Sequence, residues 1–154
     1  MDASELAAQG YRIRRVTLRD LRAVHALEQV IFPLDAYPYL DLALLFIWPG
    51  TLNLKATAPD GSFAGFVSGS RTLWSSTAWI ITLGVNPAHQ NKGLGRWLLL
   101  TAEQRMHKPI VRLTVRASNT PAITLYRHTG YTIIQRKPGY YRDSETGLVM
   151  EKEL

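Results

Sequence analysis

The sequence predicts a single mixed α/β domain whose elements follow the order β-α-α-β-β-β-α-β-α-β-β. Three observations support this fold class. Segments of alternating apolar and polar residues, typical of strands, are interspersed with segments in which apolar residues recur every three or four positions, as on one face of a helix. Proline and glycine stand where one periodicity changes to the other. The 154 residues suffice for one domain with a buried core, 1–154, in which we expect residues 1–10 to be loosely ordered.

The N-terminal half is predicted to contain two helices and four strands. Thr17 to Asp20 resembles a helix-capping box, with aspartate in place of the usual glutamate. Prolines at 33 and 38 end the first helix and frame a loop, and Pro59 to Gly61 is a hairpin turn signal. The expected elements are, in order, a strand over 11–16, helices over 21–31 and 39–47, and strands over 52–58, 63–72 and 78–85.

The C-terminal half continues with a long helix to about Lys108, where Pro109 ends it. Thr120-Pro121 places proline in the first turn of a shorter helix, and Gly130 is in position to close that helix. The expected strands are 111–115 before this helix and 131–137 and 148–152 after it.

Composition excludes several kinds of chemistry. The chain has no cysteine, so disulfides, thiolate metal sites and cysteine nucleophiles are excluded. Its four histidines are scattered without metal-ligand spacing. The net charge of +6 allows nucleic-acid binding, but the basic residues form no dense run, which favours a site for an anionic cofactor. Neither a signal peptide nor a stretch long enough to span a bilayer is evident, so we expect a cytoplasmic protein that binds neither membrane nor nucleic acid.

The most informative segment is the glycine loop Gln90–Gly95, between a predicted strand and a predicted helix. Glycines let a backbone approach a ligand closely, and the free N–H groups of a first helical turn favour phosphate or pyrophosphate. Lys92 and Arg96 add positive charge. The loop lacks the third glycine of a dinucleotide fingerprint and the Gly-Lys-Ser/Thr of a Walker loop. A helix start with two convenient glycines is the alternative interpretation.

The segment Thr82–Trp97 resembles the acetyl-CoA motif of the GNAT superfamily, whose core is Gln/Arg-x-x-Gly-x-Gly/Ala. The resemblance implies a central, mixed, mostly antiparallel twisted sheet flanked by helices. It also implies acetyl-CoA as the cofactor, with backbone groups around Leu83 and Val85 aligning the pantetheine arm. The residues implied to hold the pyrophosphate are Gln90, Asn91, Lys92, Gly93, Leu94, Gly95 and Arg96.

A second segment, Val115–Tyr131, resembles the Asn-x-x-Ala-x-x-Leu-Tyr-x-x-x-Gly-Phe/Tyr motif that follows in GNAT enzymes. The resemblance implies that Asn119 contacts the pantetheine and that Tyr126 lies near the thioester sulfur. Tyr126 is therefore the candidate general acid that protonates the departing thiolate. The alternative is that Tyr126 is an ordinary core aromatic of an amphipathic helix. The two motifs in the right order favour the acid.

Two further segments resemble protein N-terminal acetyltransferases, including the ribosomal-protein alanine acetyltransferases. They are Val30–Pro33, followed by Tyr37, and Lys137–Tyr141, followed by 147–151. The resemblance implies two loops that flank a peptide groove, whose aromatic rings with polar tips suit a backbone with few fixed features. The candidate substrate-binding residues are Phe32, Pro33, Tyr37, Trp79, Tyr140 and Tyr141. As ordinary helix-end and strand residues, the same side chains would have no such role.

The general base is left open by the sequence. Thr114 and Trp79 occupy the positions where the family often has a base, and neither side chain can serve as one. Three explanations remain: a water chain held by Thr114, the carboxylate of Asp35, or an acceptor amine that loses its proton to solvent. An α-amine, with a pKa near 8, does so more readily than a lysine side chain.

We therefore expect direct transfer of an acetyl group, in a ternary complex, to the α-amine of a protein N-terminus. The first alternative is an acetyltransferase for a small amine such as a polyamine, an amino acid or an antibiotic. The second is an acyl-CoA-binding module without turnover. We expect a monomer or a weak homodimer.

Overall fold

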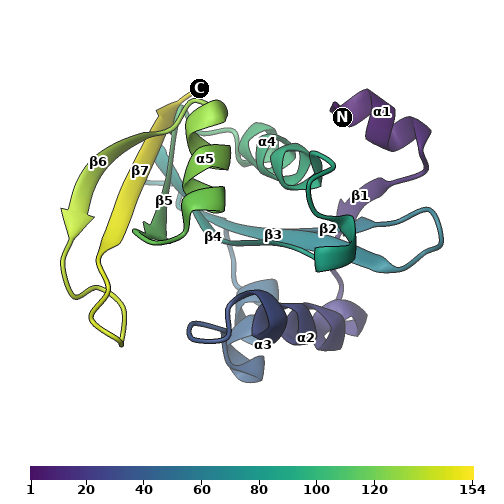
Figure 1. Ribbon diagram of the computed structural model, residues 1–154, viewed down its shortest axis with the longest axis horizontal. Helices are drawn as coiled ribbons and strands as arrows, with labels where there is room; N and C mark the ends of the chain where they lie inside the picture. Colours follow the sequence, from purple (N-terminus) through teal and green to yellow (C-terminus); the bar gives the residue numbers. More distant parts are fainter.

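The computed structural model describes all 154 residues, and a seven-stranded sheet with helices on both faces forms its centre (Figure 1). The helices are α1 (Ala3–Ala8), α2 (Leu21–Ile31), α3 (Tyr39–Ile47), α4 (Leu94–Met106) and α5 (Thr120–His128), with short 3-10 turns at Leu18–Asp20 and Pro87–His89. The strands are β1 (Arg12–Arg15), β2 (Thr51–Thr57), β3 (Phe63–Arg71), β4 (Thr77–Val85), β5 (Ile110–Arg116), β6 (Thr132–Lys137) and β7 (Gly147–Glu153). The expected fold class and element order are confirmed, with one helix added at the N-terminus.

The sheet has the strand order β1-β2-β3-β4-β5-β7-β6, and every neighbouring pair is antiparallel except β4 and β5. These two parallel strands pair only over Thr77–Trp79 and Ile110–Arg112. Beyond Trp79 of β4 and Arg112 of β5, the two strands no longer pair with each other. The edge of β4 that faces β5 is therefore open in the middle of the sheet, and a cavity lies there.

Two hydrophobic cores hold the layers together. The larger one lies between the sheet and α4, and it includes Leu98 of α4, Val67 of β3 and Tyr126 of α5. The smaller one lies on the opposite face, where α2 and α3 cover the sheet, and it includes Val24 and Leu42. Both faces of the central strands are thus covered, which explains why β3 is buried without interruption from Ala64 to Gly69.

A β-bulge at Ile81 redirects β4 at the point where β5 leaves it. Gly69 of β3 lies opposite Ile80, whereas the adjacent Ser68 lies opposite Thr82, so Ile81 is the extra residue. Ile80 belongs to the core under α4, but Thr82 reaches α2 on the opposite face. Without the bulge, Ile80 and Thr82 would project from the same face.

The N-terminal segment differs from the expectation of a loosely ordered stretch over residues 1–10. It forms α1, which Asp2 caps by accepting the backbone N–H of Glu5, while Glu5 accepts that of Asp2. Leu6 is fully buried in the larger core. A six-residue helix is marginal by itself, so docking of Leu6 against the core is what stabilises it. None of the helices is both long and apolar enough to cross a membrane.

Candidate active site

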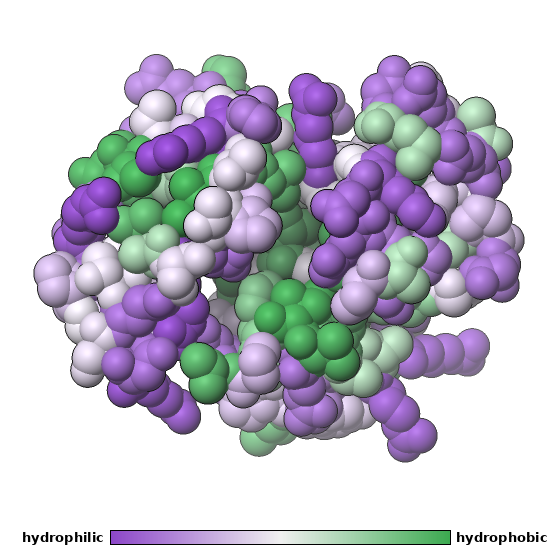
Figure 2. Space-filling model, viewed as in Figure 1, coloured by the Kyte–Doolittle hydropathy of each residue, from purple (hydrophilic) through white to green (hydrophobic).

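The opening between β4 and β5 widens into a cavity of about 740 Å³. Its walls come from α2 and the loop after it, β4, the glycine loop, the start of α4, β5, α5, and the loop between β6 and β7. Figure 2 shows the molecule hollowed near the centre of this face, with hydrophobic side chains above and below the hollow and hydrophilic ones at its sides. The volume and the mixed polar and apolar lining suit an extended small molecule and the end of a second one.

The glycine loop presents a row of backbone N–H groups without a backbone acceptor. The backbone N–H of Gln90 has a backbone acceptor, and the next N–H along the chain that has one is that of Trp97. It donates to the carbonyl of Gly93 at 3.0 Å. The six N–H groups of residues 91–96 lie between them. Asn91 and Gly93 have φ angles of 59° and 89°, and this left-handed backbone turns successive N–H groups into a concave nest. At the N-terminus of the thirteen-residue α4, such a nest fits a pyrophosphate.

The side chains of the glycine loop divide into two groups. Gln90 donates from Nε2 to the carbonyl of Val85 at 3.0 Å, and it thereby ties the loop to the end of β4. Arg96 lines the cavity. Lys92 does not, because its ammonium lies 3.5 Å from the hydroxyl of Tyr11, which is 2.9 Å from Nδ1 of His89. The charge expected from Lys92 therefore acts from outside the cavity.

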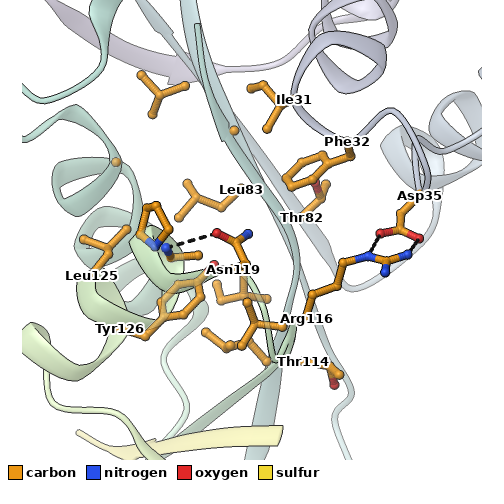
Figure 3. A pocket seen from close by; sticks show the side chains of 18 of the residues that line it. Ile31, Phe32, Asp35, Thr82, Leu83, Thr114, Arg116, Asn119, Leu125 and Tyr126 are labelled. Carbon is orange, nitrogen blue, oxygen red and sulfur yellow. Dashed lines mark hydrogen bonds and ion pairs between the residues drawn. The ribbon is translucent and has the colours of Figure 1, made fainter. Parts of the chain in front are cut away.

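Tyr126 of α5 lines the cavity from within the larger core (Figure 3). Only 8% of the residue is exposed, and burial raises the pKa of its hydroxyl well above the ordinary value. The phenol therefore remains protonated at neutral pH, as a proton donor must be. The same side chain is thus a core aromatic and a cavity residue, so the two interpretations of the sequence are compatible.

Asn119 caps the N-terminus of α5, because its Oδ1 accepts the N–H of Ala122 at 3.3 Å (Figure 3). The Nδ2 group is not needed for this cap and can donate into the cavity. Across the opening, Leu83 and Val85 lie along the free edge of β4. An extended ligand arm beside that edge would find the hydrogen-bonding groups that β5 leaves unpaired.

Glu28 of α2 is a cavity residue that no motif in the sequence marks. It is 1% exposed; its Oε1 accepts the hydroxyl of Thr82 at 2.5 Å, and its Oε2 accepts the N–H of Tyr37 at 3.2 Å. Burial raises its pKa, and these two hydrogen bonds only partly offset the effect. One signal was available, because Glu28 lies four residues after Val24 and three before Ile31, on the apolar face of the helix.

Asp35 is paired with Arg116 rather than free. The guanidinium of Arg116 donates from Nε and Nη2 to the two oxygens of Asp35, at 2.5 and 2.7 Å (Figure 3). Both oxygens of Asp35 are thus engaged by the guanidinium, and neither is free to accept a proton from an amine. Of the two carboxylates, the geometry therefore favours Glu28 over Asp35 as the acceptor of the amine proton. Thr114, on β5, also lines the cavity, but it has no carboxylate or imidazole group that could act as a base.

Arg116 also joins the two loops that flank the acceptor end of the cavity. Its Nη1 donates to Asp143 at 2.8 Å and to Glu145 at 3.2 Å, both in the loop between β6 and β7. Its guanidinium carbon lies 4.2 Å from the ring centroid of Tyr141. Asp35, on the loop between α2 and α3, is thereby held against the β6–β7 loop through one side chain. The sequence could not reveal that Arg116 connects the two loops, since its hydrogen-bond partners lie 27 to 81 residues away in the chain.

Five of the six candidate substrate-binding side chains line the cavity. They are Phe32, Tyr37, Trp79, Tyr140 and Tyr141. Pro33 is exposed and does not line it. The rings of Tyr140 and Tyr141 meet edge to face at 5.0 Å, and burial raises the pKa of Tyr141 to about 12. The hydroxyl of Tyr141 therefore remains available as a hydrogen-bond donor at neutral pH.

Arg116→Ala should weaken acceptor binding more than cofactor binding, because it releases both loops and leaves three carboxylates near one another. We expect the KM for a peptide acceptor to rise about tenfold or more, a factor worth about 1.4 kcal/mol. The KM for acetyl-CoA should change less than about twofold, as no loop contact reaches the glycine loop. Arg112→Ala is the matched control: it lies on the same strand, pairs with Glu151 at 2.6 Å and does not line the cavity. An equal effect of both variants on peptide KM contradicts this role.

Comparison with known proteins agrees with this geometry. The model of the acetyltransferase (GNAT) family matches residues 20–131. The chain is 37% identical over 114 residues to the N-terminal acetyltransferase B complex catalytic subunit NAA20 of Arabidopsis thaliana, covering 70% of this chain and 64% of the relative. It is 40% identical over 107 residues to the N-alpha-acetyltransferase RimI of Mycobacterium tuberculosis, covering 62% and 68%. The chain thus spans about two thirds of the length of these two curated relatives.

Among solved structures, the ribosomal-protein-S18-alanine N-acetyltransferase of Escherichia coli superposes with a TM-score of 0.82 at 27% identity, over 93% of both chains. The structure of Ard1 from Thermoplasma volcanium superposes with a TM-score of 0.81 at 29% identity, over 94% of this chain and 97% of that one. The likeness therefore extends over nearly the whole length of this chain.

Proposed function

Because this chain belongs to the acetyltransferase (GNAT) family, with acetyl-CoA as the acetyl donor, we propose that it acetylates the α-amine of a protein N-terminus. The observation that carries the proposal is the placement of a buried carboxylate, Glu28, and a buried phenol, Tyr126, in the walls of one cavity. Acyl transfer to an amine needs a group that takes a proton and a group that gives one.

The residues present fit acetyl-CoA. The free N–H groups of residues 91–96 and the side chain of Arg96 would hold its pyrophosphate. The open edge of β4 at Leu83 and Val85, together with Nδ2 of Asn119, would align the arm that carries the thioester. When bound, the cofactor supplies an acetyl group activated as a thioester.

Glu28 is proposed as the base. Its carboxylate takes the proton of the acceptor amine, directly or through one water, and leaves the nitrogen lone pair free to attack. Because burial raises its pKa, Glu28 is a stronger base than an exposed glutamate. Thr82 and the N–H of Tyr37 hold the carboxylate in one orientation.

Tyr126 is proposed as the acid. Its Oη donates a proton to the leaving sulfur, and burial keeps this proton in place until it is needed. The hydroxyl has no hydrogen-bond partner within the protein, so it is free to turn toward the cavity. Substrate attack and proton donation then occur in one ternary complex without a covalent acyl-enzyme.

The acceptor end of the cavity supports a peptide rather than a small polar amine. Aromatic side chains from two loops enclose it, and Arg116 fixes the distance between these loops. Tyr37, Tyr140 and Tyr141 offer hydroxyl groups that suit the backbone of an extended peptide. Two relatives at 37% and 40% identity are N-terminal acetyltransferases, which agrees with this acceptor class.

The decisive experiment is acetyl-CoA-dependent thiol release with short peptides that differ in their first residue. The comparison acceptors are the same peptides with a blocked α-amine, free lysine and spermidine. We expect turnover only with a free peptide α-amine, whose pKa near 8 makes it easier to deprotonate than a lysine side chain. Turnover confined to lysine or spermidine would replace the N-terminal acceptor with a small amine. Tight acetyl-CoA binding without any turnover would point to a binding module.

A further inference from the structure

A line of polar side chains begins at Glu28 on α2 and crosses strands β4, β3 and β2. Thr82 of β4 donates to Glu28, Ser68 of β3 lies opposite Thr82, and Asn53 of β2 lies opposite Ser68. Directly opposed residues project from the same face of a sheet. Here that face lies under α2 and α3, because Asn53 donates from Nδ2 to the carbonyl of Leu45 in α3 at 3.3 Å. The bulge at Ile81 is what brings Thr82 into this line.

Two atoms in the middle of the line are buried without a hydrogen-bond partner in the protein. They are Oγ of Ser68 and Oδ1 of Asn53, which belong to directly opposed residues. Ser68 is fully buried. Leaving such groups unsatisfied is costly, and proteins commonly satisfy them with internal water that bridges several polar atoms. Neighbouring unsatisfied atoms from two side chains are the arrangement that a bridging water requires.

The line ends at a second cavity. This cavity has a volume of about 340 Å³ and lies between α3 and the sheet. Its wall includes Thr51, whose Oγ1 accepts from Nδ2 of Asn53 at 3.2 Å, and Trp48, which is 65% exposed. Polar atoms therefore lead from the carboxylate of Glu28 to a second cavity, whose wall includes the exposed Trp48.

We propose that water bound by Ser68 and Asn53 completes a proton path from Glu28 to the second cavity. This inference rests on the proposed function, in which Glu28 takes a proton from the acceptor amine. Glu28 is 1% exposed even with no substrate beside it, and bound substrates cover its remaining access through the main cavity. A base so enclosed needs another way to lose its proton before the next turnover.

Each step along the path exchanges one O–H bond for another. The amine proton forms an O–H bond on Glu28, which passes it to the hydroxyl of Thr82 as that hydroxyl gives its own proton to the bound water. Ser68 and Oδ1 of Asn53 hold this water in place, and the water gives up one of its own protons to solvent water that enters from the second cavity. Glu28 is left as a carboxylate, and no oxidant, reductant or co-reactant is consumed.

The test compares the pH dependence of peptide acetylation in Ser68→Ala and Asn53→Ala with that of Thr101→Val. Thr101→Val removes a hydroxyl that bonds to the carbonyl of Trp97 within α4, away from the path. At pH 7 we expect kcat of the two path variants to fall about fivefold, with peptide and acetyl-CoA KM unchanged. Near pH 9.5 the difference should fall below about twofold, because an α-amine with a pKa near 8 is then already neutral. A purely structural defect would lower kcat at both pH values.

The outcomes separate this inference from the proposed function. If the wild type acetylates peptides and Glu28→Gln is slow, but both path variants behave like Thr101→Val, the path is refuted while the function stands. A crystal structure provides a measurement that does not depend on turnover. We expect an ordered water within hydrogen-bond distance of both Oγ of Ser68 and Oδ1 of Asn53, and a well-resolved map without it overturns the inference.

Discussion

Glu28→Gln is expected to lower kcat/KM for a peptide acceptor by about 10² to 10³ at pH 7, within the range of general acid–base catalysis. Glutamine keeps the size of the side chain and an oxygen that can accept from Thr82 or Tyr37, but it cannot take a proton. Acetyl-CoA binding should be unchanged, since Glu28 lies on α2 and the loop that would hold the pyrophosphate begins at Gln90.

The pH profile gives a second readout for Glu28. Only the ionised carboxylate is a base, so the wild-type rate rises with pH through the raised pKa of Glu28. In Glu28→Gln the rise in rate that accompanies ionisation of Glu28 is lost. The rate then rises only as the α-amine, with a pKa near 8, loses its proton. The loss should therefore shrink above about pH 9, where the acceptor needs no base. A loss that is constant across pH would contradict the assignment.

Stability should change in the opposite direction to activity in Glu28→Gln. The pKa of Glu28 is raised in the folded protein, so the folded state binds a proton more tightly than the unfolded chain. The contribution of Glu28 to stability is therefore fully present below the unfolded pKa and is lost as pH rises through the folded pKa. At pH 7 glutamine removes the cost of a buried carboxylate, and we expect Tm to be equal to or above that of the wild type.

Glu103→Gln is the matched control. Glu103 is 3% exposed and accepts from Tyr131 and Lys152, so it is another buried, hydrogen-bonded glutamate, but it does not line the cavity. Its replacement leaves Lys152 without a carboxylate partner and should lower Tm while kcat remains unchanged. If Glu103→Gln slows turnover as much as Glu28→Gln does, loss of a buried carboxylate rather than loss of a base explains both.

Tyr126→Phe is the second variant with a large expected effect. Removing the hydroxyl leaves the leaving sulfur without its proton donor, and kcat should fall by about 10². Peptide and acetyl-CoA KM should change little, since the ring that packs in the core is retained. Steady-state kinetics with thiol release measures both parameters.

The control for Tyr126 is Tyr131→Phe. The two rings lie 5.7 Å apart and both are buried, but Tyr131 donates to Glu103 and does not line the cavity. Loss of this hydrogen bond should lower stability by about 1 kcal/mol, with kcat retained. Full activity in Tyr126→Phe would rule out the phenol as the acid and leave solvent as the proton source.

Features carried by contiguous sequence were predictable. The glycine loop was recognised because a strand, two glycines and a helix follow one another within Thr82–Trp97. Tyr126 was recognised because its motif surrounds it in the chain. Lys92 lies in the same loop, but its side chain turns to Tyr11, and sequence spacing does not specify side-chain direction. The signal for α1 was also present, since Asp2 and Glu5 have capping-box spacing, but its stability depends on the docking of Leu6.

The proposed base, Glu28, was not predictable in the same way. A single polar residue on the apolar face of α2 is a weak signal. The hydrogen bond that orients the carboxylate of Glu28 comes from Thr82, 54 residues away. That hydrogen bond depends on the bulge at Ile81. The local sequence, a strand rich in isoleucine and threonine, does not predict a bulge there. Asp35 was the more visible candidate in the sequence, and only the fold shows that Arg116 already pairs with it.

The sequence by itself thus determined the order of the elements, the glycine loop and the position of Tyr126, because each is specified by neighbours within a few turns of chain. Only the tertiary structure decided which carboxylate faces the cavity, how the two acceptor loops are joined, and where β4 and β5 part. These features depend on contacts between residues far apart in the chain, and such contacts exist only once the sheet has formed and the helices have packed against its two faces.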